Sequence, residues 1–183
     1  MDDVYFLYLH GYKGSPGSVK AVKLFKWLND NFQDIKIDAP LLNMHKESGF
    51  REIKRLLDSS NASRKVIFGT SLGGYLAHLL KQTRSDIDQV ILINPAVRLD
   101  LIVQDIRYAQ FKEDALILTN MMPEKLVNLS DYLVLLQDDD HSTPSKYAQQ
   151  EFSNGTIDIK SGQGHHYDQI EVSFSLIKDF LNI

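Results

Sequence analysis

Ser71 stands between two glycines in the run Gly69-Thr70-Ser71-Leu72-Gly73, between an apolar stretch of strand length and a segment with helical spacing. A strand-to-helix turn of this kind strains the backbone of the serine and directs its Oγ away from the sheet. The flanking positions must lack side chains because the backbones approach closely. The alternative is a tight turn with an incidental serine. We predict that Ser71 is a nucleophile.

A serine hydroxyl is a weak nucleophile at neutral pH and needs a base within hydrogen-bond reach, itself oriented by a third group. Among the six histidines, His165 and His166 lie in a glycine-containing loop between the last apolar run and the last predicted helix. We predict His165 as the base, with His166 or a solvated loop histidine as the alternatives. His10 is expected to fix its own loop by hydrogen bonds rather than to act in catalysis.

The third group is expected in the run Asp138-Asp139-Asp140, which follows an apolar run and lies between the serine and the histidine in the chain. We assign Asp140, with Asp139 as the alternative, although an acidic run is more often a solvated loop. Pro144 is expected to open a helix that Thr143 caps.

The same acidic run could instead bind a metal together with His141 and His165, because carboxylates and imidazoles are metal ligands. No other part of the sequence has the spacing of a ligand set. We therefore predict that the protein uses neither a metal nor a cofactor.

Two backbone donors are also needed where negative charge develops on the substrate. The N–H of Leu72 follows the serine at the start of the predicted helix, where negative charge is favoured. The run His10-Gly11-Tyr12 lets the backbone turn sharply after the first apolar run. We predict the N–H groups of Tyr12 and Leu72 as the oxyanion hole.

These residues must be positioned by a sheet, because apolar runs of strand length alternate with amphipathic segments. The runs are Val4–Leu9, Ile35–Ile37, Lys65–Phe68, Gln89–Ile93, Tyr132–Leu136 and Thr156–Ile159. Continuous apolar runs are typical of parallel strands buried on both faces, with helices making right-handed crossovers. We predict an α/β fold, a three-layer α/β/α sandwich with a short, mostly parallel sheet of about six strands.

Apolar residues at helical spacing mark one face of two of the predicted helices. They are Val22, Phe25, Leu28 and Phe32 within 18–32, and Ile170, Phe174, Ile177 and Leu181 near the C-terminus.

Residues 95–130 contain no run of strand length and are expected to form short helices above the carboxyl edge of the sheet, where ligands bind in such folds. One hypothesis is a small helical cap in which Ile106, Tyr108, Phe111 and methionines wall an acyl pocket. The other is an ordinary crossover helix with a loop. We predict that Ile106 and Tyr108 bind the substrate.

Composition limits the class of protein. The chain has 183 residues, 43% hydrophobic and 24% charged, which predicts one globular domain over 1–183. A net charge of −4 without a basic cluster disfavours nucleic acid. The lack of cysteine excludes disulfides and thiolate catalysis. The acidic start and the absence of a bilayer-length apolar stretch predict a cytoplasmic protein without a membrane partner.

Taken together, the motifs resemble the α/β-hydrolase superfamily over essentially the whole chain. They are Leu9-His10-Gly11, the run Gly69–Gly74, Asp140-His141-Ser142-Thr143-Pro144 and Gly162–Tyr167. The stretch Tyr8–Ser18 looks like that of the small bacterial esterases of the YqiA type. Two positions depart from the family, which usually has a glycine at Asp139 and a small residue at His166. The resemblance implies a shortened sheet and hydrolysis of acyl esters or thioesters.

We therefore expect a serine esterase or thioesterase acting on a small acyl ester or thioester. Ser71 attacks the acyl carbonyl, His165 takes its proton and later activates water, and Asp140 orients the imidazole. The alternatives are a non-catalytic binding protein with the same fold, or a hydrolase of peptides or C–C bonds using the same three residues.

Overall fold

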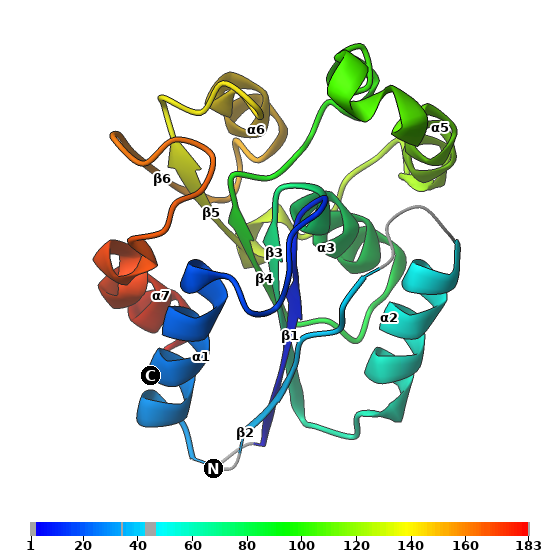
Figure 1. The fold of residues 1–183 in the computed structure, drawn as a ribbon. Helices are drawn as coiled ribbons and strands as arrows, with labels where there is room; N and C mark the ends of the chain where they lie inside the picture. Colours follow the sequence, from blue (N-terminus) through cyan, green and yellow to red (C-terminus); the bar gives the residue numbers. More distant parts are fainter. Residues whose placement is uncertain (1–2, 34, 43–46, 183) are drawn as a thin grey trace.

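The computed structural model describes residues 3–33, 35–42 and 47–182, and its centre is one sheet of six strands (Figure 1). The strand order is β2-β1-β3-β4-β5-β6, and every neighbouring pair is parallel. The strands are β1 (Val4–Leu9), β2 (Ile35–Asp38), β3 (Arg64–Thr70), β4 (Gln89–Ile93), β5 (Tyr132–Gln137) and β6 (Thr156–Lys160). The predicted α/β class and the predicted strands are confirmed.

Helices cover both faces of the sheet. The helices are α1 (Val19–Asn31), α2 (Glu47–Ser59), α3 (Leu72–Thr83), α4 (Leu99–Ile102), α5 (Lys112–Met121), α6 (Ser145–Glu151) and α7 (Phe174–Leu181). The described residues also form three short 3₁₀ helices: η1 (Ile106–Phe111), η2 (Leu129–Asp131) and η3 (Ile170–Ser173). In Figure 1, α1 and α7 lie on one side of the sheet and α2 on the other, which is the expected α/β/α sandwich.

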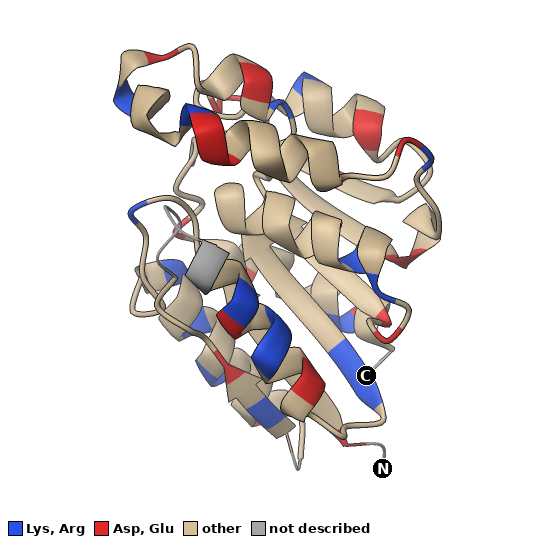
Figure 2. Ribbon diagram, turned by 90° about the vertical axis from the view of Figure 1, so that its right-hand side faces the viewer, with Lys and Arg blue, Asp and Glu red and all other residues tan. Residues whose placement is uncertain are grey.

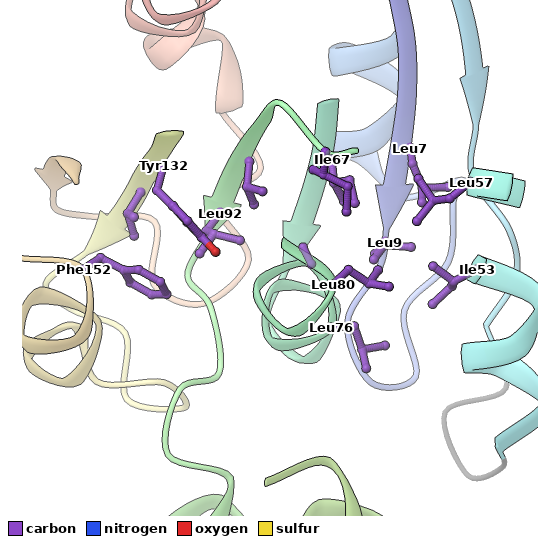
Figure 3. Close-up of a cluster of buried hydrophobic side chains, with 14 of the residues drawn as sticks. Leu7, Leu9, Ile53, Leu57, Ile67, Leu76, Leu80, Leu92, Tyr132 and Phe152 are labelled. Carbon is purple, nitrogen blue, oxygen red and sulfur yellow. The ribbon is translucent and has the colours of Figure 1, made fainter. Parts of the chain in front are cut away.

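The core is divided by the sheet because successive side chains of a strand point to opposite faces. On one face, Leu7 and Leu9 of β1 belong to a buried cluster with Ile53 of α2 and Leu80 of α3 (Figure 3). On the other face, Phe6 of β1 belongs to a second cluster, to which α1 and α7 contribute. All six residues of β1 are buried, as expected for a parallel strand covered on both sides.

The predicted apolar face of α1 is wrong at one position. Val22 is 56% exposed, whereas Ala21, Leu24 and Leu28 are fully buried. The buried stripe follows the spacing of these three residues, and Val22 lies outside it because each residue turns a helix by about 100°. The face predicted near the C-terminus is confirmed, with buried Ile170, Ile177 and Leu181 and a partly buried Phe174 packed beside them.

Residues 95–130 form α4, η1, α5 and η2 and no strand, as predicted. Figure 1 shows this segment, in green, at the end of the sheet where the strands terminate. Its buried residues Leu99, Phe111 and Ala115 pack in a third cluster with Leu72 of α3. On the outer side of this segment, the apolar side chain of Leu116 is 63% exposed.

Charged residues lie mainly on the helices and loops around the sheet (Figure 2), and the strands β1, β4 and β5 contain none. In the part of the chain that the structure describes, no helix is long and apolar enough to cross a membrane.

Candidate active site

Ser71 lies at the junction of β3 and α3 with φ 52° and ψ −121°, a backbone conformation that residues other than glycine rarely adopt. Close backbone contacts hold it there. A Cβ on Gly69 would lie 2.5 Å from the carbonyl oxygen of Gly73, and one on Gly73 would lie 2.1 Å from that of Leu9. The turn therefore needs glycine at both positions, and Ser71 projects from the carboxyl edge of the sheet.

A chain of hydrogen bonds runs from Ser71 through His165 to Asp140. The Nε2 atom of His165 lies 3.1 Å from Ser71 Oγ, and its Nδ1 atom lies 2.7 Å from Asp140 Oδ2. The three residues follow β3, β6 and β5, so the parallel sheet brings together side chains that are far apart in the sequence. Of the two adjacent histidines, it is His165 that reaches the serine.

The carboxylate of Asp140 is buried and accepts several hydrogen bonds. Oδ1 accepts from the N–H groups of Ser142 and Thr143 at 2.8 and 3.0 Å, and the Thr143 hydroxyl lies 2.6 Å from Oδ2. Burial raises the pKa of Asp140, but hydrogen bonds from His165 and Thr143 outweigh it, so the pKa lies below its ordinary value. Asp140 is therefore ionised at neutral pH.

The neighbouring aspartates have other partners. Asp139 accepts a hydrogen bond from the N–H of Gly164, and Asp138 accepts one from the Ser161 hydroxyl. The structure thus brings Asp140, rather than Asp139, to the imidazole. Within the described ranges, no group of three or more histidine and acidic side chains is arranged to hold a metal ion.

Thr143 does not cap the following helix, contrary to the prediction. Pro144 is the N-cap residue of α6, and no side chain caps that helix. The Thr143 hydroxyl points instead toward Asp140 and lies 3.1 Å from the carbonyl oxygen of Asn94. Because the Asp140 carboxylate and the Asn94 carbonyl are both acceptors within reach, the Thr143 hydroxyl is directed toward them and away from the N-terminus of α6.

His10 fixes the loop after β1, as predicted. Its Nε2 atom accepts a hydrogen bond from the N–H of Leu42 at 2.9 Å, so Nδ1 carries the proton and donates to the carbonyl of Gly11 at 2.7 Å. This loop packs against Ser71, because a Cβ on Gly11 would lie 2.9 Å from Ser71 Cβ. Tyr12 follows directly, and Leu72 is the first residue of α3, whose early N–H groups have no acceptor within the helix.

A cavity of about 310 Å³ opens beside Ser71. Its lining residues are Tyr12, Ser71, Leu72, Ala96, Leu99, Ile102, Arg107, Tyr108, Phe111, Ser142, Thr143, His165 and His166. Apart from Arg107, the lining residues within 99–111 form an apolar and aromatic wall, in which the ring of Tyr108 packs edge-to-face on that of Tyr12 with centroids 5.5 Å apart.

Two predictions about this wall are wrong. Ile106 does not line the cavity, because it begins η1 with its side chain directed outward and 87% exposed. Ile102 of α4 lines the cavity instead. The predicted methionines are also absent from the lining, and Met121 is partly exposed at the end of α5.

Residues 5–182 match the model of the Uncharacterised protein family (UPF0227). The chain belongs to the UPF0227 family. Among solved structures it is similar to Est1E from Butyrivibrio proteoclasticus, with a TM-score of 0.74, 15% identity and coverage of 99% of this chain and 88% of that one.

Two further structures agree. Alpha/beta hydrolase domain-containing protein 10 from mouse has a TM-score of 0.71, 13% identity and coverage of 97% and 89%. The esterase Pf2001 from Pyrococcus furiosus has a TM-score of 0.68, 16% identity and coverage of 99% and 83%. The predicted resemblance to the α/β-hydrolase superfamily is confirmed for the fold of this UPF0227 protein.

Asn94 is a site residue of this UPF0227 protein that sequence reasoning missed. It is buried directly after β4 with φ 43°, and its amide nitrogen donates to the carbonyl of Gly164 at 3.0 Å. Its Oδ1 atom accepts from the N–H of Gln137 at 2.8 Å. Asn94 therefore ties the histidine loop to the ends of β4 and β5. The sequence could have pointed to this residue, because an asparagine before a proline at the end of a strand indicates left-handed backbone, which asparagine tolerates.

Proposed function

We propose that this protein is a serine hydrolase that cleaves small acyl esters or thioesters. One observation carries the proposal: the hydrogen-bonded chain Ser71–His165–Asp140 ends in a serine on a strained turn, beside a cavity with a largely apolar wall. A serine whose hydroxyl meets an imidazole that is oriented by a carboxylate is the arrangement that acyl transfer requires.

The reaction has two halves. Ser71 Oγ attacks the acyl carbonyl carbon while His165 Nε2 takes its proton, and the N–H groups of Tyr12 and Leu72 stabilise the oxyanion. Collapse of the intermediate expels the alcohol or thiol, which receives the proton from His165. Water then attacks the acyl-enzyme with His165 again as base, and the carboxylic acid leaves. Asp140 holds the imidazole tautomer throughout, and no cofactor is needed.

The volume of the cavity favours a substrate with a short to medium acyl chain. About 310 Å³ lies at the lower end of the volumes of small-molecule pockets. The apolar residues Leu99, Ile102 and Phe111 on its wall suit a hydrocarbon chain better than a charged peptide. This favours an ester or thioester over the peptide alternative.

The test is Ser71→Ala, assayed on p-nitrophenyl and acyl-CoA esters of increasing chain length and with a fluorophosphonate probe. We expect a loss of roughly 10³-fold or more in kcat and no labelling. Ser142→Ala is the matched control, because it removes another hydroxyl from the same cavity and keeps the backbone N–H that Asp140 accepts. Normal turnover by folded Ser71→Ala, or a wild type that neither hydrolyses nor labels, would reject the proposal, and the second result would favour a binding protein.

A further inference from the structure

Lys20 is a buried cation on α1, a helix that carries none of the residues of the proposed triad. It is only 5% exposed. The other buried lysines of the described residues, Lys65 and Lys81, form ion pairs with Asp86 and Asp131, whereas Lys20 forms none with any described residue. Burying an ammonium group without a paired carboxylate is costly, so the contacts that it does make are informative.

Its two contacts join the segments that carry the nucleophile and the base. The Nζ atom donates to Thr70 Oγ1 at 3.0 Å and to the carbonyl oxygen of His166 at 2.7 Å. Thr70 directly precedes Ser71, and His166 directly follows the histidine that reaches the serine. One side chain therefore bridges the end of β3 and the histidine loop.

The histidine loop depends on such external contacts because its own backbone is permissive. Gly162 and Gly164 have φ values of 95° and 53°. Asn94 holds the loop at Gly164, and Lys20 holds it two residues later. The histidine that reaches the serine, His165, lies between these two points of attachment.

The bridge does not depend on the charge of the amine. Burial lowers the pKa of Lys20 to about 8, although Asp168 and Asp140 act in the opposite direction. An uncharged amine still has two N–H donors, one for each acceptor, so both contacts survive loss of the proton.

We propose that Lys20 is a positioning residue that fixes the imidazole of His165 relative to Ser71 Oγ. The inference rests on the proposed serine-hydrolase function. A displacement of about 1 Å between reacting groups can lower a rate by about 100-fold. Loss of the bridge therefore acts on the chemical step and not on substrate binding, because Lys20 does not line the cavity.

The test compares Lys20→Met with Lys23→Met on one chromogenic ester. Lys23 is the matched control, because it lies on the same helix and donates to the carbonyl of Asp168 at 2.9 Å but is partly exposed and pairs with Glu171. We expect Lys20→Met to lower kcat by about ten- to a hundredfold with KM unchanged. Lys23→Met should match the wild type.

A purely structural role predicts a lower Tm with a normal kcat in the folded protein. We expect the opposite, because removing an ammonium group that is buried without a paired carboxylate also removes its desolvation cost, so Tm of Lys20→Met should not fall at pH 7. A folded Lys20→Met protein with normal kcat, or one in which only KM or Tm changes, overturns the inference.

A second measurement needs no turnover. The proton shared by His165 Nδ1 and Asp140 should give a low-field signal in a proton NMR spectrum, weakened in Lys20→Met and retained in Lys23→Met. If the wild type hydrolyses no ester but shows this pattern, the proposed function fails and the positioning role stands. An unchanged signal in Lys20→Met rejects the positioning role whatever the activity.

Thr70→Val tests the same contact from the other end, at the acceptor of the Lys20 hydrogen bond. It removes the hydroxyl acceptor, and we expect a kcat loss that does not add to that of Lys20→Met, because both variants break the hydrogen bond between Lys20 and Thr70. If Lys20→Met does not fold, Thr70→Val decides alone: reduced kcat with unchanged KM supports the bridge, and normal kcat rejects it.

Discussion

The turn around Ser71 and the 95–130 segment both border the cavity, and they are held in different ways. The turn is held by backbone: neither Gly69 nor Gly73 has room for a single added carbon. The segment is held by side chains such as Leu99 and Phe111, which pack on the start of α3. Ser71, the proposed nucleophile, is thus fixed by contacts that tolerate no change, whereas the cavity wall is built from side chains that can be exchanged one at a time.

The ion pairs of the segment support this contrast. Arg98 pairs with Asp100 and Arg107 with Asp105, each two residues away and with both partners largely exposed. Exposed pairs of this kind contribute about 0–1 kcal/mol. The segment therefore depends on its few buried apolar residues, and under the proposed function its preference for an acyl chain can change without disturbing the turn around Ser71. Three predictions test this difference.

The largest effect is expected for Gly73→Ala, because the new Cβ would lie 2.1 Å from the carbonyl oxygen of Leu9 and backbone must move. We expect a loss of at least about 3 kcal/mol in the free energy of unfolding, measured by urea denaturation, together with loss of ester hydrolysis. Gly17→Ala is the control, since its Cβ would meet only Ser15 Oγ at an ordinary 3.6 Å. Normal stability of Gly73→Ala would contradict the rigid description of the turn.

Asp140→Asn should come next, with kcat lower by about 10³–10⁴-fold on a chromogenic ester. The amide cannot reproduce the carboxylate, because donors face both of its oxygens, so the variant should also lose about 1–3 kcal/mol of stability. Asp139→Asn is the control and should keep near-normal kcat, since an amide oxygen still accepts from Gly164. If Asp139→Asn lost most of its kcat while Asp140→Asn kept a normal kcat, Asp139 would be the acid that orients His165.

The pH dependence of Asp140→Asn sharpens this result. The pKa of Asp140 lies below its ordinary value of 3.8, so its ionised form stabilises the fold above pH 3.8. That contribution is lost as the pH falls through the lowered pKa. The difference in stability between wild type and Asp140→Asn should therefore shrink under acid conditions.

The smallest effect is expected in the wall. Ile102→Ala enlarges the cavity and should shift the preferred acyl chain to a longer one, with changes of up to about tenfold in kcat/KM across the series. Ile106→Ala is the matched control, because its side chain is exposed and outside the cavity. Equal profiles for both variants and the wild type would show that this wall does not select the acyl chain.

The sequence by itself determined the architecture and the position of the serine. Continuous apolar runs such as that of β5 predict buried parallel strands, because local periodicity reports how many faces of an element are covered. The glycines on either side of Ser71 also indicate, from the neighbouring sequence alone, that two backbone segments approach closely there. These features depend on neighbouring residues alone, and so they can be read without knowledge of the fold.

Only the tertiary structure decided which side chains meet. Asp139 and Asp140 are adjacent in the chain, yet one contacts Gly164 and the other His165. The sequence pattern also could not predict that Ile106 points outward. Nor could it predict that Lys20 bonds to Thr70, which lies 50 residues away in the chain. The physical reason is that a side chain's partner depends on the path of loops after the strands, and loop paths are set by long-range packing and hydrogen bonds rather than by local periodicity.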